Sequence, residues 1–162
     1  MRMRLISTLL FLAAFVLVFY TIGAALFEGH VNYPTWYFIG AAEFRSYHQE
    51  IGKRIIPVLV IPLMAAFIFT LLLLGFRPLP ISRRAVSLSV ALQFTVILST
   101  VVVFLPIQAQ LSQQGLSPEL LDRLIATNWL RDIPGLVNGG LYVWMMYQIV
   151  VERERKTSLS LT

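Results

Sequence analysis

Four long apolar segments, none containing an Asp, Glu, Lys, Arg or His residue, limit what this sequence can fold into. They run over Leu5–Phe27, Ile55–Gly75, Ala85–Ile107 and Ile133–Val151. At a rise of about 1.5 Å per residue, each is long enough to cross the roughly 30 Å hydrocarbon core of a bilayer. Backbone polar groups in lipid must pair within their own segment, so the segments are predicted to be helices and not strands.

The composition also favours a membrane protein. Hydrophobic residues make up 57% of the chain and charged residues 13%, whereas about a quarter of a soluble globular chain is charged. The sequence contains no cysteine, which excludes disulfides, thiolate metal sites and Cys-x-x-Cys redox pairs. We predict an all-α fold in which residues 1–162 form one domain, an integral membrane four-helix bundle.

The N-terminal segment has two interpretations. Two arginines precede the first apolar run, as in a signal peptide. The run Leu5–Phe27 is longer than the roughly 7 to 15 residues of a signal-peptide core, so we expect an uncleaved first span. The small residues Gly23, Ala24 and Ala25 leave cleavage as the alternative.

Basic residues are distributed unevenly among the connections. The two ends and the short 76–84 connection hold eight basic and two acidic residues, and the other two connections hold five basic and six acidic residues. The charges are therefore +6 on one side and −1 on the other. The positive-inside rule predicts that both termini are cytoplasmic and that the protein lies in the cell (inner) membrane. The net positive charge therefore no longer favours nucleic-acid binding. The expected partners are bilayer lipids, with a homo-oligomer or a membrane-protein partner as further options.

The two outer connections are predicted to contain amphipathic helices. Residues 42–54 have apolar side chains at three- and four-residue spacing, and this helix is expected to continue into the second span. In the other connection, Ser117 is a good N-cap and Pro118 suits the first helical position of a helix along the membrane surface. We expect Asp132 and Pro134 to begin the last span.

Polar and aromatic side chains gather at the outer ends of the predicted spans, where facing helices of a bundle commonly build ligand sites. Interfacial Trp and Tyr residues also anchor proteins that have no site there, so both interpretations stay open. The candidate substrate-binding residues are Glu28, His30, Trp36, Trp129 and Asn138.

Three of the outer residues are candidates for catalysis: His48, Asn128 and Arg131. His48 would act as a base and Arg131 would stabilise an oxyanion, although Arg131 can also be a snorkelling interfacial arginine. His30 and His48 could together ligate a haem, but two histidines without a ligand spacing are a weak indication. We expect no metal and no cofactor, and favour a structural hydrogen-bonding role for His48.

Small and polar residues within the last span predict close packing. Gly135 and Gly139 form a Gly-x-x-x-Gly motif, which favours packing within the bundle, with homodimerisation as the alternative. An amide inside a span needs a partner, and Gln93 in the third span is the expected partner of Asn138.

Four short stretches carry a family resemblance. They are Val31-Asn32-Tyr33-Pro34-Thr35-Trp36, His48, Pro106, and Asn128-Trp129-Leu130-Arg131. With them the chain resembles a group of small bacterial four-helix membrane proteins of unknown function. Its layout is also distantly similar to the anthrone-oxygenase-like membrane family, whose members oxidise polyketide anthrones to anthraquinones with dioxygen. The resemblance implies a four-helix architecture and chemistry on a lipophilic aromatic substrate, although Pro134 interrupts the expected last span.

Three hypotheses for function follow. The first is an accessory protein that binds a small molecule or lipid in an outward-facing pocket. The second is a membrane oxidoreductase for a lipophilic aromatic or quinone-like substrate, and the third is a structural subunit of a larger membrane complex. Ionisable groups are missing from the spans, which argues against a self-sufficient ion-coupled pump.

The predicted topology can be tested with single cysteines, because the natural chain has none. A cysteine at position 112 in the Ser112→Cys variant should react with a membrane-impermeant reagent in intact cells, and one at position 82 in the Ser82→Cys variant should not. The reverse labelling pattern would contradict the assigned orientation.

Overall fold

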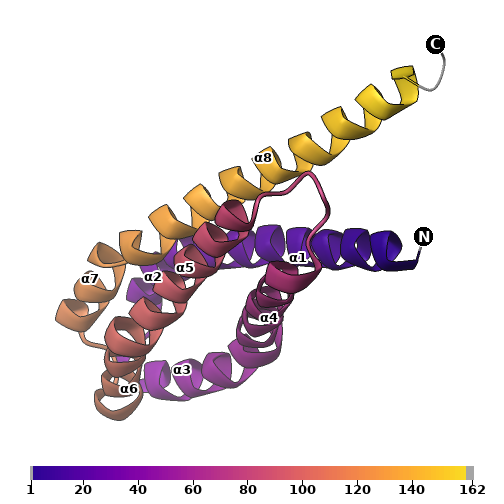
Figure 1. The fold of residues 1–162 in the computed structure, drawn as a ribbon. Coiled ribbons are helices and arrows are strands. Elements are labelled where there is room, and N and C mark those ends of the chain that lie inside the picture. Colours follow the sequence, from indigo (N-terminus) through magenta and orange to yellow (C-terminus); the bar gives the residue numbers. More distant parts are fainter. Residues whose placement is uncertain (1, 160–162) are drawn as a thin grey trace.

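A computed structural model describes residues 2–159, and all regular structure in this range is helical (Figure 1). Three continuous helices are long and apolar enough to cross a membrane: Leu5–Phe38, Ala41–Phe76 and Arg83–Gln114. They contain the first three of the four predicted spans, which confirms those spans as helices. The predicted outer helix does run on without a break into the second span.

Each long helix is made of several segments. The first consists of α1 (Arg2–Phe27), the π-helical η1 (Glu28–Asn32), α2 (Tyr33–Thr35) and the 3-10 segment η2 (Trp36–Phe38). The second consists of α3 (Ala41–Ile55), the π-helical η3 (Ile56–Val60) and α4 (Ile61–Phe76). The third consists of α5 (Arg83–Ser99), the π-helical η4 (Thr100–Phe104) and α6 (Leu105–Gln114).

Two further helices follow, α7 (Pro118–Ala126) and α8 (Trp129–Leu159). The Ser117 side chain accepts a hydrogen bond from the backbone N–H of Leu120, so the predicted N-cap of α7 is confirmed. The predicted start of the last helix was wrong. α8 begins before Asp132, because the Asn128 carbonyl already accepts the N–H groups of Arg131 and Asp132, and Pro134 lies inside the helix without ending it.

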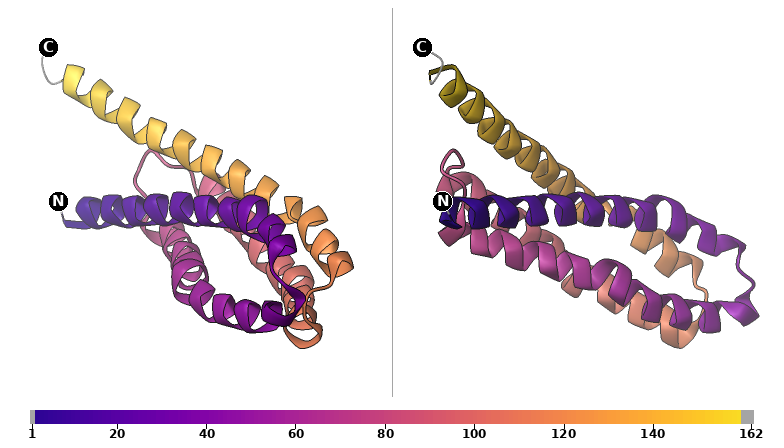
Figure 2. Two further views of the ribbon diagram at one scale, coloured as in Figure 1. Left: turned by 180° about the vertical axis from the view of Figure 1, so that it is seen from behind. Right: turned by 90° about the vertical axis from the view of Figure 1, so that its right-hand side faces the viewer.

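The four long helices pack side by side. α1 contacts α4 and α8, and α5 contacts α4 and α8. The two ends of the described chain lie at the same end of the bundle, and the C-terminal part of α8 extends away from the other helices (Figure 2). Buried apolar side chains form two clusters, one among α1, α4, α5 and α8 and one among the segments at the opposite end.

A chain of buried polar side chains ties α8 to α5 and α4. The Ser89 hydroxyl donates to the Asn138 side-chain oxygen at 2.6 Å, and the Gln93 amide donates to the hydroxyls of Ser89 and Thr70 at 3.2 and 2.8 Å. Thr70 in turn lies 2.7 Å from the Tyr142 hydroxyl. Asn138 and Gln93 therefore belong to one network, as predicted, but Ser89 connects them.

The Gly-x-x-x-Gly motif of α8 packs against α1. A Cβ atom added to Gly139 would lie 3.0 Å from the end of the Ile22 side chain, and one added to Gly135 would lie 3.9 Å from the same residue. This contact supports the favoured interpretation of the motif, packing within the bundle.

All three π-helical segments are followed by a proline at the same spacing. Tyr33, Ile61 and Leu105 donate their N–H groups to the carbonyl five residues earlier, and in each case the next residue is a proline. A proline has no N–H to donate to the carbonyl four residues earlier, and its ring crowds that carbonyl. The wider i to i−5 turn before each proline accommodates it without ending the helix.

Two neighbouring glycines of α8 test the packing against α1. Gly139→Leu should lower the free energy of unfolding by roughly 1–3 kcal/mol, because the side chain would overpack the Ile22 contact. A Cβ atom at Gly140 meets open space, so Gly140→Leu is the matched control and should be neutral or stabilising. Thermal unfolding in detergent micelles measures both, and equal melting temperatures would contradict the contact.

Candidate functional site

A cavity of about 630 Å³ lies between the second and third long helices. α4 packs on α5 and α3 packs on α6, while η3 and η4, between these contacts, both line the cavity. Its walls are mostly apolar. Its polar and aromatic lining includes Glu28, Tyr33, Trp36, His48, Lys53, Thr100, Phe104, Gln108, Ser112 and Arg131.

Apolar side chains that line the cavity reach the protein surface. Ile56 and Leu105 are 51% and 55% exposed. Both lie in helices apolar enough to cross a membrane. Lys53, which also lines the cavity, has a side chain that is 77% exposed.

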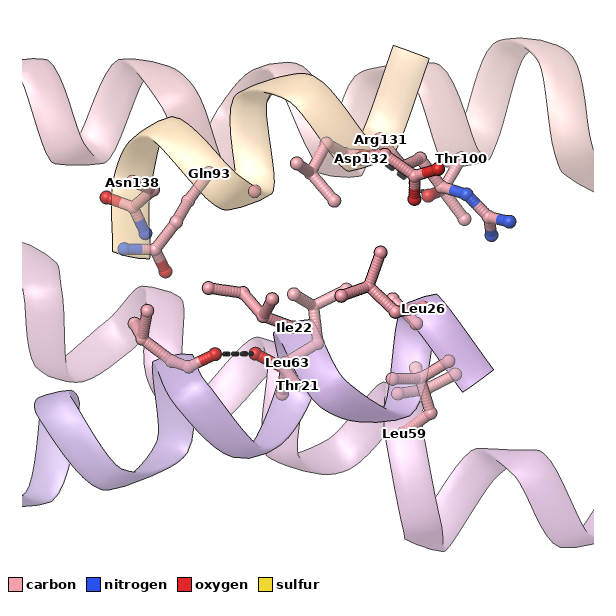
Figure 3. A pocket seen from close by; sticks show the side chains of 15 residues that line it. Thr21, Ile22, Leu26, Leu59, Leu63, Gln93, Thr100, Arg131, Asp132 and Asn138 are labelled. Carbon is pink, nitrogen blue, oxygen red and sulfur yellow. Dashed lines mark hydrogen bonds between the residues drawn. The ribbon is translucent and has the colours of Figure 1, made fainter. Parts of the chain in front are cut away.

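A second, smaller cavity of about 90 Å³ adjoins the first. Figure 3 shows its polar side chains in two groups at opposite ends, with Gln93 and Asn138 in one group and Arg131 and Asp132 in the other. The residues that line both cavities are Leu59, Val60, Thr100 and Arg131.

Arg131 is the charged group at the junction of the two cavities, and only 8% of it is exposed. Its guanidinium carbon lies 3.5 Å from the centre of the Phe104 ring, a cation–π contact. Its Nη2 atom donates to the Asn128 side-chain oxygen at 2.5 Å and to the Tyr33 hydroxyl at 3.4 Å. Within residues 2–159, no carboxylate lies within salt-bridge distance of Arg131, and its buried Nε atom has no hydrogen-bond partner.

The neighbouring carboxylates have hydrogen-bond donors of their own. Asp132 accepts from the Asn128 amide at 2.9 Å and from His30 at 2.8 Å. Glu28, which is buried, accepts from the Asn32 amide at 2.8 Å. Asn128 thus offers its oxygen to Arg131 and its nitrogen to Asp132, and it separates the two charges. Gly29 in η1 makes this arrangement possible, because a Cβ atom there would collide with the Asn128 amide.

Both ring nitrogens of His48 are hydrogen-bonded. Nε2 lies 2.6 Å from the side-chain oxygen of Gln108, which can only accept, so Nε2 carries the proton. Nδ1 then accepts from the Ser112 hydroxyl at 2.9 Å. The ring also stacks on Phe44 and meets the edge of Trp36. This environment favours the structural role predicted for His48, since proton abstraction or iron ligation by Nδ1 would require breaking the Ser112 hydrogen bond.

The catalytic candidates are connected through Tyr33, which lies in one of the four resembling stretches, and through Gln108, which sequence reasoning did not single out. Gln108 links His48 to the Tyr33 hydroxyl at 3.3 Å, and Tyr33 contacts Arg131. His48, Arg131 and Asn128 therefore belong to one hydrogen-bonded network.

The substrate-binding candidates are placed differently from one another. Glu28 and Trp36 line the larger cavity, and Asn138 lines the smaller one. His30 is 62% exposed, with Asp132 as its partner, and Trp129 is 58% exposed. Neither residue lines the two cavities, and His30 and His48 sit in separate surroundings.

Four buried side-chain polar atoms in the described part of the chain have no hydrogen-bond partner. They are Trp36 Nε1, Gln93 Oε1, Arg131 Nε and Asp132 Oδ1. All four belong to residues that line one of the two cavities. Buried polar atoms normally have a partner, and these four have none within the described chain.

Phe104 and Gln108 are the site residues that sequence reasoning missed. The signal that could have found them is the proline spacing, because Pro106 lies between them and the π-helical turn directly before Pro106 ends at Phe104. Comparisons with protein-family models, with curated proteins and with solved structures find no match.

Proposed function

We propose that this chain is a membrane-embedded binding protein that holds a lipophilic small molecule in its larger cavity. One observation carries the proposal: an apolar cavity of about 630 Å³ is lined by a buried arginine without an acidic partner. Ligand cavities of roughly 300–1,000 Å³ are typically apolar, with a few polar groups that orient the ligand. Arg131, Trp36 and Tyr33 would be those groups.

Arg131 is costly for a bundle that needs only to pack. Burying a guanidinium without a carboxylate partner removes its hydration, and an apolar residue of similar size often packs at lower cost. Charged residues are rarely buried unless they are paired. The Nε atom is buried and has no hydrogen-bond partner, which adds to that cost.

The proposal includes a position in the membrane. The protein spans the cell (inner) membrane with both ends in the cytoplasm, and α8 is the fourth span. The charge difference between the two sides supports this orientation. The support for α8 is its row of exposed apolar side chains, which would be unfavourable in water: Ile133, Leu136, Val137, Val143, Trp144 and Val150.

Neither the oxidoreductase nor the structural-subunit alternative has an observation of similar weight. A base at His48 would need a free ring nitrogen, and both nitrogens have protein partners. The apolar outer faces of the helices suit lipid as well as a second protein.

Two glycines of the long helices test the binding function. Gly52 lines the larger cavity, whereas Gly23 lies in α1 away from it. A Cβ atom added at either position meets open space. Gly52→Phe should reduce ligand occupancy because its ring would take up cavity volume, and Gly23→Phe should not. Native mass spectrometry of each variant, purified in mild detergent, measures the bound molecule.

A wild-type protein that carries no bound lipophilic molecule, and binds none that is added, would contradict the proposal. So would equal occupancy in the Gly52→Phe and Gly23→Phe variants.

A further inference from the structure

We infer that the ligand is a single-chain amphipath with an anionic carboxylate head, such as a long-chain fatty acid, whose head contacts Arg131. Its hydrocarbon chain extends through the larger cavity to the surface between η3 and η4. This inference rests on the proposed binding function and names the class of ligand.

The charges that line the larger cavity favour an anion. Arg131 and Lys53 are the cationic residues of the lining, and Glu28 is the acidic one, so two positive charges stand against one negative charge. Lys53 lies 3.7 Å from the Glu50 carboxylate, but the Lys53 side chain is 77% exposed. An exposed pair of this kind contributes little. Arg131 has no carboxylate within salt-bridge distance among the described residues, and its charge acts on Glu28 only over a longer distance.

The guanidinium of Arg131 is held in a fixed orientation beside the cavity. Phe104 lies against one face, and the Nη2 bonds to Asn128 and Tyr33 hold the group in place. These two bonds use both N–H groups of Nη2, and the Nε atom is buried, so a carboxylate would contact the guanidinium through its charge and not through two parallel donors. An ordered guanidinium loses little freedom when it binds an anion.

The two nearby carboxylates do not pair with Arg131 in place of a ligand. Asp132 is held by Asn128 and His30, and Glu28 is held by Asn32. Each acidic group therefore has a donor of its own, and Arg131 forms a salt bridge with neither of them. Glu28 lines the same cavity, so its negative charge would repel the head of an anionic ligand.

The shape of the cavity favours one hydrocarbon chain that enters from the bilayer. A volume of about 630 Å³ suits one drug-sized molecule, and a two-chain phospholipid is larger than that. The exposed apolar residues Ile56 and Leu105 line the cavity, and both lie in helices apolar enough to cross a membrane. A molecule already dissolved in the outer half of the bilayer would reach Arg131 without crossing water.

Binding of radiolabelled palmitate to the full chain in nonionic detergent micelles tests this inference, with 1-hexadecanol as the neutral competitor. Palmitate should bind at one saturable site, and hexadecanol should compete about tenfold more weakly or worse, since a hydrogen bond to a charged group contributes this much. Arg131→Gln should weaken palmitate binding by about tenfold or more for the same reason. Arg123→Gln, which removes an arginine outside the cavities, should leave binding unchanged.

A second variant keeps the inference testable if Arg131→Gln fails to fold. Glu28→Gln removes the negative charge of the cavity and keeps an acceptor for Asn32. It should therefore tighten palmitate binding several-fold and leave hexadecanol binding unchanged.

Three results would overturn the anionic single-chain assignment. They are equal competition by hexadecanol, no change in palmitate affinity in Glu28→Gln, and equal or stronger competition by a two-chain phosphatidylglycerol. If hexadecanol still binds and Gly52→Phe abolishes its binding, the binding function stands without the assigned head group. If neither palmitate nor hexadecanol binds and the purified protein carries no lipophilic molecule, the binding function itself fails.

Discussion

The contact between the Arg131 guanidinium and the Phe104 ring is the interaction on which the half of the molecule around the two cavities depends. It joins the first turn of α8 to η4, and the Tyr33 hydroxyl adds the end of the first long helix. In an apolar bundle, an arginine that was merely buried would be costly. Here the aromatic ring and two oxygen acceptors offset part of that cost, while the buried Nε atom has no partner in the described chain.

The cavity beside this arginine is lined by η3 and η4, two π-helical turns that each precede a proline. Pro62 cannot donate to the Val58 carbonyl, and the Tyr20 hydroxyl of α1 donates to that carbonyl instead at 2.9 Å. A carbonyl left free inside lipid would be costly, so this bond lets η3 keep its wider turn. Pro106 follows η4 at the same spacing. The two altered turns line the same cavity, and regular helices with the same apolar residues could pack along their full length.

The sequence predicts the features that depend on local pattern. Hydrophobic length located three of the four long helices, the Ser117-Pro118 pair located the start of α7, and the position of His48 on an apolar helix face predicted a buried, hydrogen-bonded ring. Features that depend on distances between helices could not be predicted from the sequence. Ser89 stands between Gln93 and Asn138 because of the relative rotation of α5 and α8, which no spacing along the chain specifies. The predicted start of the last helix was wrong. A proline such as Pro134 often marks the beginning of a helix, but the Asn128 carbonyl already accepts backbone N–H groups before it, so α8 begins earlier.

The most direct test of this account is an experimental structure of the full chain, purified in mild detergent and reconstituted in lipid nanodiscs. The account predicts elongated density that begins beside the Arg131 guanidinium and extends through the larger cavity to the surface between η3 and η4. Glu28 would keep its bond to Asn32. A larger cavity closed by side chains, with Arg131 paired directly to Glu28 and no density beside it, would contradict the central claim.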